Sequence, residues 1–239
     1  MASETASASG RESARALDPV VVWSREEERR AGTPLVVLLH GYGSNEQDLM
    51  SLVPGLPEEF TYVSVRAPVR MDGPSGPGGS FTWFPLDPER LAYRSDEALG
   101  AVEDLWSWIA SVKEQHSSVT LLGFSMGMAM ATSLLRSRPD EFAAVVGLSG
   151  FAVDPAGVQE VQEKFDDDAL AARRVPFFWG RDQEDPIVPQ EYVDYTHAWA
   201  NRAVKLTKVL YAGAGHGVVP QEVSHVGEFL THTVLNGKG

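Results

Sequence analysis

The feature that most constrains this 239-residue chain is residues 119–132, where an apolar run meets Gly-Phe-Ser-Met-Gly and then a Met/Ala-rich segment. The apolar run is typical of a buried strand, and the segment after it favours a helix. A Gly-x-Ser-x-Gly turn between a strand and a helix is typical of a nucleophile elbow. Gly123 and Gly127 suit it because side chains there would crowd the strained serine. We therefore expect Ser125 to be a nucleophile.

Strand-like runs alternate with amphipathic segments along the rest of the chain. Alternation of this kind predicts an α/β fold with a mostly parallel central sheet and helices on both faces. The polar segment 24–33 is expected to be a turn or hairpin connection. The expected strands are residues 20–23, 34–39, 61–65, 119–122, 143–150, 175–180 and 204–211, and the main expected helices are 97–112, 126–138, 190–200 and 219–234.

Composition limits the domain organisation and the partners. Residues 1–19 are predicted to be a disordered N-terminal tail, and residues 20–239 a single domain. The formal charge is −13 and no Lys/Arg cluster interrupts it, which argues against nucleic acid as a partner. No apolar run is long enough to span a bilayer, so no stable membrane insertion is expected. The absence of cysteine excludes disulfides and thiolate metal sites, and it fits the cytoplasmic location that we expect.

A serine nucleophile needs a base, and the base needs an acid to orient it. Downstream of Ser125, His216 lies in a glycine-flanked loop after the last expected strand, so we predict that it is the base. Three acids after the preceding strand compete for the third role, namely Asp182, Glu184 and Asp185. We favour Asp185 because the rigid apolar segment Pro-Ile-Val-Pro that follows it can shield a carboxylate, whereas the other two are expected to face solvent.

The tetrahedral intermediate of acyl transfer needs hydrogen-bond donors, commonly two backbone N–H groups. We expect these donors to be the N–H groups of Met126 and Tyr42, the latter in a glycine-rich loop after the strand 34–39. His40 in the same region is expected to be a structural, hydrogen-bonded imidazole. Apolar residues near the motif loops are candidates for the substrate pocket: Trp83, Phe84, Met126, Phe151 and Val188.

These segments together resemble the phospholipase/carboxylesterase family of α/β-hydrolases, which includes bacterial carboxylesterases and acyl-protein thioesterases. The resemblance covers about residues 20–235. It implies an α/β-hydrolase fold and a cofactor-free serine esterase with the nucleophile, acid, base and oxyanion donors named above. Met126 departs from the glutamine frequent in the family, and the Gly/Pro-rich insert at 73–79 looks longer than usual. The matching motifs are residues 38–49, 83–86, 123–127, 148–150, 185–189 and 213–216.

We therefore expect a serine carboxylesterase that hydrolyses small-molecule esters of modest acyl length through an acyl-enzyme. A thioesterase or lysophospholipase with the same triad is the alternative, and a non-catalytic ligand-binding member of the fold is a third possibility. No metal is expected, since HExxH and similar ligand clusters are missing from the sequence. The oligomeric state does not follow from these patterns.

Overall fold

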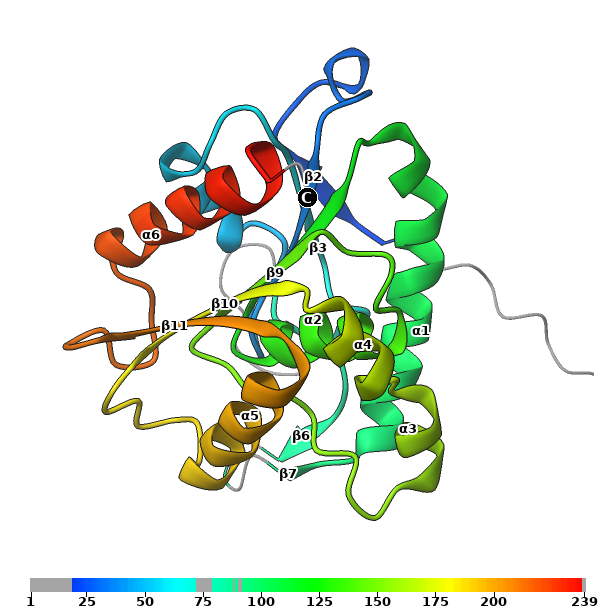
Figure 1. Ribbon diagram of the computed structural model, residues 1–239, viewed down its shortest axis with the longest axis vertical. Coiled ribbons are helices and arrows are strands. Elements are labelled where there is room, and N and C mark those ends of the chain that lie inside the picture. Colours follow the sequence, from blue (N-terminus) through cyan, green and yellow to red (C-terminus); the bar gives the residue numbers. More distant parts are fainter. Residues whose placement is uncertain (1–18, 72–78, 88, 90–91, 238–239) are drawn as a thin grey trace, which may run out of the picture.

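A seven-stranded sheet runs through the computed structural model, which describes residues 19–71, 79–87, 89 and 92–237 (Figure 1). The strand order is β1-β3-β2-β8-β9-β10-β11. The strands are β1 (Val21–Trp23), β2 (Leu35–Leu39), β3 (Thr61–Val65), β8 (Val119–Phe124), β9 (Ala144–Leu148), β10 (Pro176–Asp182) and β11 (Lys205–Tyr211).

The sheet is parallel from β3 to β11, and β1 alone pairs antiparallel at its edge. β1 contacts β3 and not β2, so the hairpin considered for residues 24–33 does not form. This segment instead holds the 3₁₀ turn Glu27–Arg29 and carries the chain past β3 to the interior strand β2. Because β2 is buried on both faces, it belongs inside the sheet, which leaves the edge to the short β1.

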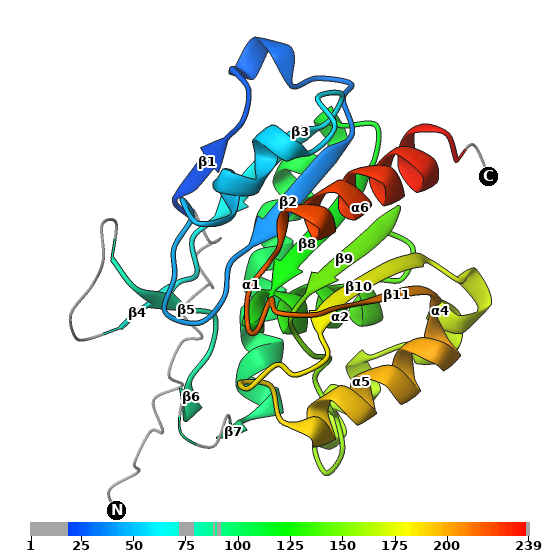
Figure 2. The same ribbon diagram turned by 90° about the vertical axis from the view of Figure 1, so that its left-hand side faces the viewer.

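Alternate residues of the buried strands enter two separate cores, one on each face of the sheet. Leu35 and Val37 of β2 point to one core, and Val36 and Leu38 to the other. The first core is covered by α1 (Ser95–Val112), α2 (Met126–Ser137), α4 (Asp167–Arg173) and α5 (Gln190–Ala203), with α3 (Gln159–Lys164) beside α1. The second is covered by α6 (Pro220–Leu230) and the 3₁₀ segment η2 (Leu49–Gly55). Figure 2 shows α6 on the opposite side of the sheet from α1 and α5. The predicted α/β architecture with helices on both faces is thus confirmed.

The long irregular region after β3 carries two small antiparallel pairs. They are β4 (Val69–Arg70) with β5 (Phe81–Thr82), and β6 (Leu86–Asp87) with β7 (Ala92–Tyr93). The Gly/Pro-rich insert at 73–79 falls outside the described residues except for Gly79, as does the predicted tail except for Pro19. Two short helical segments, η3 (Lys113–Gln115) and the π-helical η4 (Thr231–Leu235), complete the elements. Across the described residues, no helix is both long and apolar enough to cross a membrane.

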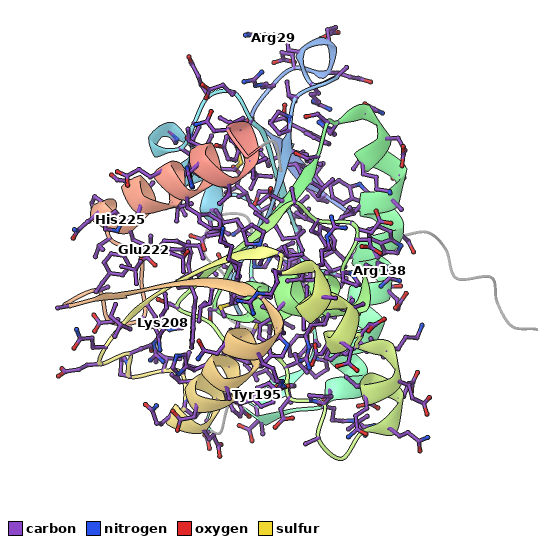
Figure 3. The ribbon with its side chains drawn as sticks, viewed as in Figure 1. Arg29, Arg138, Tyr195, Lys208, Glu222 and His225 are labelled. Carbon is purple, nitrogen blue, oxygen red and sulfur yellow. The ribbon has the colours of Figure 1, made fainter. Side chains whose placement is uncertain are left out.

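The second core contains a buried carboxyl group without a partner. Glu222, in the first turn of α6, is fully buried, and neither carboxyl oxygen has a hydrogen-bond partner among the described residues (Figure 3). Its Oε1 lies over β10, and a Cβ built on Gly180 would lie only 2.0 Å from this oxygen. Burial disfavours the charged carboxylate and raises the pKa of Glu222 from its ordinary 4.5 to about 7.

This raised pKa predicts a loss of stability with rising pH. Between pH 4.5 and 7 the folded chain keeps a proton on Glu222 that the unfolded chain releases, so this group's contribution to the free energy of unfolding falls. The pKa difference corresponds to about 3 kcal/mol, lost as the pH passes through 7. Urea unfolding of Glu222→Gln at pH 5 and pH 8 should therefore show a flatter pH dependence. Glu228→Gln, which alters an exposed residue of α6, should keep the wild-type slope, and equal slopes in both variants would contradict the prediction.

Candidate active site

Ser125 lies at the turn between β8 and α2 in a strained backbone conformation, with φ 54° and ψ −118°. Its neighbours at ±2 must be glycine. A Cβ on Gly123 would lie 2.1 Å from the carbonyl oxygen of Gly127, and one on Gly127 would lie 1.8 Å from the carbonyl oxygen of Leu39. The glycines therefore let α2 start directly against the ends of β8 and β2. The turn has the geometry of a nucleophile elbow at the carboxyl edge of the sheet.

Three side chains from separate loops form a hydrogen-bonded series at this edge. The Nε2 atom of His216 lies 2.9 Å from Ser125 Oγ, and its Nδ1 lies 2.9 Å from Asp185 Oδ2. Ser125 follows β8, Asp185 follows β10 and His216 follows β11, so the parallel sheet brings together residues up to 91 positions apart. The structure thus juxtaposes the three residues that the sequence predicted as nucleophile, acid and base.

The carboxylate of Asp185 is fully buried and fixed through both oxygens. While Oδ2 faces His216, Oδ1 accepts hydrogen bonds from the N–H groups of Ile187 at 2.8 Å and Val188 at 3.3 Å. The apolar segment after Asp185 therefore supplies donors as well as shielding. A carboxylate held in this way can orient the imidazole and stabilise a positive charge on it.

Two further polar residues hold the backbone on either side of His216. Asp182, at the end of β10, accepts a 2.7 Å hydrogen bond from Gly215 N–H, and Ser149 after β9 donates one of 3.0 Å to the carbonyl of Gly217. Hydrogen bonds from the Glu184 and Gly215 N–H groups hold the pKa of Asp182 below its usual range.

Asp182 is buried, so the expectation that it faces solvent is wrong. Its carboxylate accepts a hydrogen bond from the backbone of the neighbouring loop, and the order of residues in the chain does not reveal this contact. Glu184, as expected, is an exposed residue.

The glycine-rich loop after β2 lies directly against Ser125. A Cβ on Gly41 would lie 3.0 Å from the Phe124 ring and 3.4 Å from the Ser125 Cβ, so a side chain here would press on the ring next to the nucleophile. Tyr42 and Met126, the two predicted oxyanion donors, both line the cavity that contains Ser125. Met126 is the first residue of α2, and its N–H therefore lies outside the intrahelical hydrogen-bond ladder. Its side chain is buried and its Sδ lies 3.3 Å from the Thr82 hydroxyl.

His40 behaves as the structural imidazole that the sequence suggested. It is fully buried, its Nε2 accepts a hydrogen bond from Ala67 N–H at 3.0 Å, and its Nδ1 lies 2.8 Å from the Gly41 carbonyl. Burial lowers the pKa of His40, which favours the neutral ring. The ring therefore supports the loop that carries Tyr42 and does not line the cavity at Ser125.

A cavity of about 380 Å³ opens at Ser125 and His216. Of the predicted pocket residues, Met126, Phe151 and Val188 line it. Leu86, Phe124 and Ile187 also contribute to its walls and were not predicted. Leu86 and Ile187 lie within motifs already noted in the sequence, at 83–86 and 185–189. Their position within these motifs is the sequence feature from which both could have been predicted as pocket residues.

Trp83 and Phe84 do not line this cavity, and the prediction that they form its wall needs correction. Both are almost completely buried in the core. The indole N–H of Trp83 donates to the carbonyl of His40 at 2.9 Å, and Phe84 packs against Tyr93 with ring centroids 5.5 Å apart. The Trp83 N–H needs a buried acceptor, which draws this segment beneath the loop and leaves Leu86 to face the cavity.

Comparison with known proteins agrees with this geometry. The family model described as Phospholipase/Carboxylesterase matches residues 20–234, nearly all of the described chain. The chain belongs to this family. It is therefore a serine hydrolase with the α/β-hydrolase fold, as the motifs predicted. Acyl-protein thioesterase 1 of Saccharomyces cerevisiae is 25% identical over 219 residues, covering 82% of this chain and 90% of the yeast protein.

Solved structures show the same fold. Esterase PE8 is 26% identical with a TM-score of 0.69, covering 85% of this chain and 94% of its own. Acyl-protein thioesterase 2 of Zea mays has a TM-score of 0.71 at 20% identity, covering 90% and 98% of the two chains. The Bacillus cereus carboxylesterase has a TM-score of 0.69 at 18% identity, covering 90% and 95%.

The remaining histidines of this hydrolase lie away from Ser125. His116 is within 3.1 Å of the Thr33 carbonyl, and His225 Nδ1 lies 2.9 Å from the Tyr211 hydroxyl, so both have partners within the fold. His197 and His232 also lie outside the cavity at Ser125. Within the part of the chain that the structure describes, no group of three or more His, Asp or Glu side chains is arranged to hold a metal ion.

Proposed function

We propose that this family member is a serine carboxylesterase in which Ser125 is the nucleophile, His216 the general base and Asp185 the acid that orients it. The observation that carries the proposal is the pair of 2.9 Å contacts linking Ser125 Oγ to His216 Nε2 and His216 Nδ1 to Asp185 Oδ2. Contacts of this length fall within the range required for proton transfer between nucleophile and base.

In the proposed reaction, Ser125 Oγ attacks the ester carbonyl carbon while its proton passes to His216 Nε2. The oxyanion receives hydrogen bonds from the Tyr42 and Met126 N–H groups, and Asp185 stabilises the imidazolium. Collapse of the intermediate breaks the bond to the alcohol oxygen, which takes the proton from His216. Water, deprotonated by the same imidazole, then attacks the acyl-enzyme and releases the carboxylic acid and free Ser125.

The walls of the cavity support an acyl group of modest length. The side chains of Leu86, Phe151, Ile187 and Val188 present an apolar lining within about 380 Å³. Burial of acyl methylenes against such side chains contributes to binding through the hydrophobic effect. Small-molecule esters of short to medium carboxylic acids are therefore the proposed substrates.

Thioester hydrolysis is the second candidate, favoured by the similarity to the yeast protein named acyl-protein thioesterase 1. Kinetics on matched pairs, such as hexyl butyrate and S-hexyl thiobutyrate, separate the two. A carboxylesterase should give the higher kcat/KM on the oxygen ester after correction for the uncatalysed rates. A higher corrected value on the sulfur ester would identify a thioesterase, and failure to hydrolyse either compound would reject both functions.

A further inference from the structure

An apolar groove leads away from the cavity at Ser125. It consists of two cavities of about 200 and 430 Å³. The first shares Asp48 and Phe124 with the cavity at Ser125, and it shares Ser51, Leu52 and Val218 with the second. The three spaces therefore adjoin one another in a row. We call the two outer ones the outer groove, whose apolar lining is Leu49, Leu52, Phe124, Val218, Val219 and Val223.

The outer groove begins on the His216 side of the nucleophile. The ring of Phe124 packs against the imidazole of His216 with centroids 5.2 Å apart, and Gly217 and Val218 follow His216 directly in the chain. The groove then runs between η2 and the start of α6. The side chains proposed for the acyl group, Leu86 and Phe151 among them, line the inner cavity and not this groove.

This position identifies the half of a substrate that the groove receives. In the proposed function, on which this inference rests, His216 Nε2 donates its proton to the leaving oxygen. The alcohol half of the ester must therefore lie beside the imidazole, where the outer groove begins. We propose that the outer groove binds the alkyl chain of the alcohol half and makes the enzyme selective for esters of apolar alcohols over those of anionic alcohols.

The charges around the groove determine the kind of alcohol. No lysine or arginine lines the inner cavity or the outer groove in the described part of the chain. At their junction lies Asp48, whose Oδ2 accepts a 2.8 Å hydrogen bond from Ser44 Oγ. An anionic alcohol would find a carboxylate here and no cation, in a chain of formal charge −13. A neutral alkyl chain meets the side chains of Leu52 and Val218.

The test is the dependence of kcat/KM on the alcohol at constant acyl group. From ethyl to hexyl butyrate, four methylenes enter the groove, and partial burial of each should raise kcat/KM roughly twofold or more, or at least tenfold in total. The butyrate ester of 6-hydroxyhexanoate, in which a carboxylate replaces the terminal methyl of the six-carbon chain, should react at least about tenfold more slowly than hexyl butyrate. Equal kcat/KM for ethyl and hexyl butyrate would overturn the proposal, as would equal values for the hexyl and carboxylated esters.

A substitution in the groove provides the second measurement. Leu52→Asp places a charge on the wall shared by the two outer cavities, so the hexyl-to-ethyl ratio of kcat/KM should fall about tenfold. Leu210→Asp is the matched control, because Leu210 is 49% exposed on β11 and lines neither cavity. Its ratio should remain that of the wild type, and an unchanged ratio in Leu52→Asp would count against the groove.

Because the wild-type series is decisive alone, poor folding of Leu52→Asp leaves the test intact. Failure of the wild type to hydrolyse ethyl butyrate would instead reject the proposed esterase function.

Discussion

Replacing Ser125 by alanine is expected to lower kcat for a p-nitrophenyl ester by roughly 10⁶-fold, the loss seen when a serine nucleophile is removed. The substitution deletes the Oγ that lies 2.9 Å from His216 Nε2, and with it the acyl-enzyme route. Alanine keeps the Cβ that the elbow already accommodates, so the fold should persist. Steady-state kinetics, combined with covalent labelling by a fluorophosphonate probe, measure the effect.

The control for this substitution is another serine that the structure places far from the elbow. Ser107 is exposed on α1, where its hydroxyl donates to the Glu103 carbonyl. Ser107→Ala should hydrolyse the ester and react with the probe as the wild type does. Turnover by Ser125→Ala above about 1% of the wild-type rate, or labelling of that variant by the probe, would refute the nucleophile assignment.

Local sequence was sufficient to predict the elbow because its physical requirements are local. A buried strand, two glycines and a helix start within ten residues of one another determine the conformation at Ser125. Chain position then pointed to His216 and to three acids after the preceding strand, since the carboxyl ends of parallel strands meet at one edge of the sheet. The apolar segment that follows Asp185 favoured it over the other two. The placing of alternate β2 side chains in two cores also follows from the sequence, because an uninterrupted apolar run is typical of a strand that is covered on both faces.

What the sequence did not reveal depends on contacts between distant segments. Asp182 was predicted to face solvent, because the backbone N–H donor that satisfies its buried carboxylate belongs to Gly215, 33 residues away in another loop. Trp83 was assigned to the pocket because aromatic residues in a long loop suggest a binding wall. Its N–H instead finds the His40 carbonyl 43 positions earlier in the chain. The pairing of β1 with β3 likewise depends on which edge of the sheet is free.

Replacing Asp185 by asparagine is expected to lower kcat by about 10⁴-fold while leaving the fold intact, as in serine hydrolases whose triad aspartate is changed to asparagine. The carboxylate now accepts from His216 Nδ1 at 2.9 Å and fixes the tautomer whose Nε2 can take the Ser125 proton. An amide can donate to Nδ1 instead, which stabilises the wrong tautomer, and it lacks the charge that balances the imidazolium.

Asp182→Asn is the matched comparison, because Asp182 ends β10, Asp185 lies three residues later, and both contact the loop of His216, yet Asp182 binds backbone and not the imidazole. We expect a loss in kcat of roughly 10- to 100-fold, since the loop is held less firmly while the chemistry of the imidazole is unchanged. Measuring kcat and urea unfolding for both variants separates the roles: Asp185→Asn should affect mainly catalysis, whereas Asp182→Asn should also lower stability. If Asp182→Asn gave the 10⁴-fold loss and Asp185→Asn did not, Asp182 would be the catalytic acid, and the hydrogen bond that Asp185 accepts from His216 would have only a structural role.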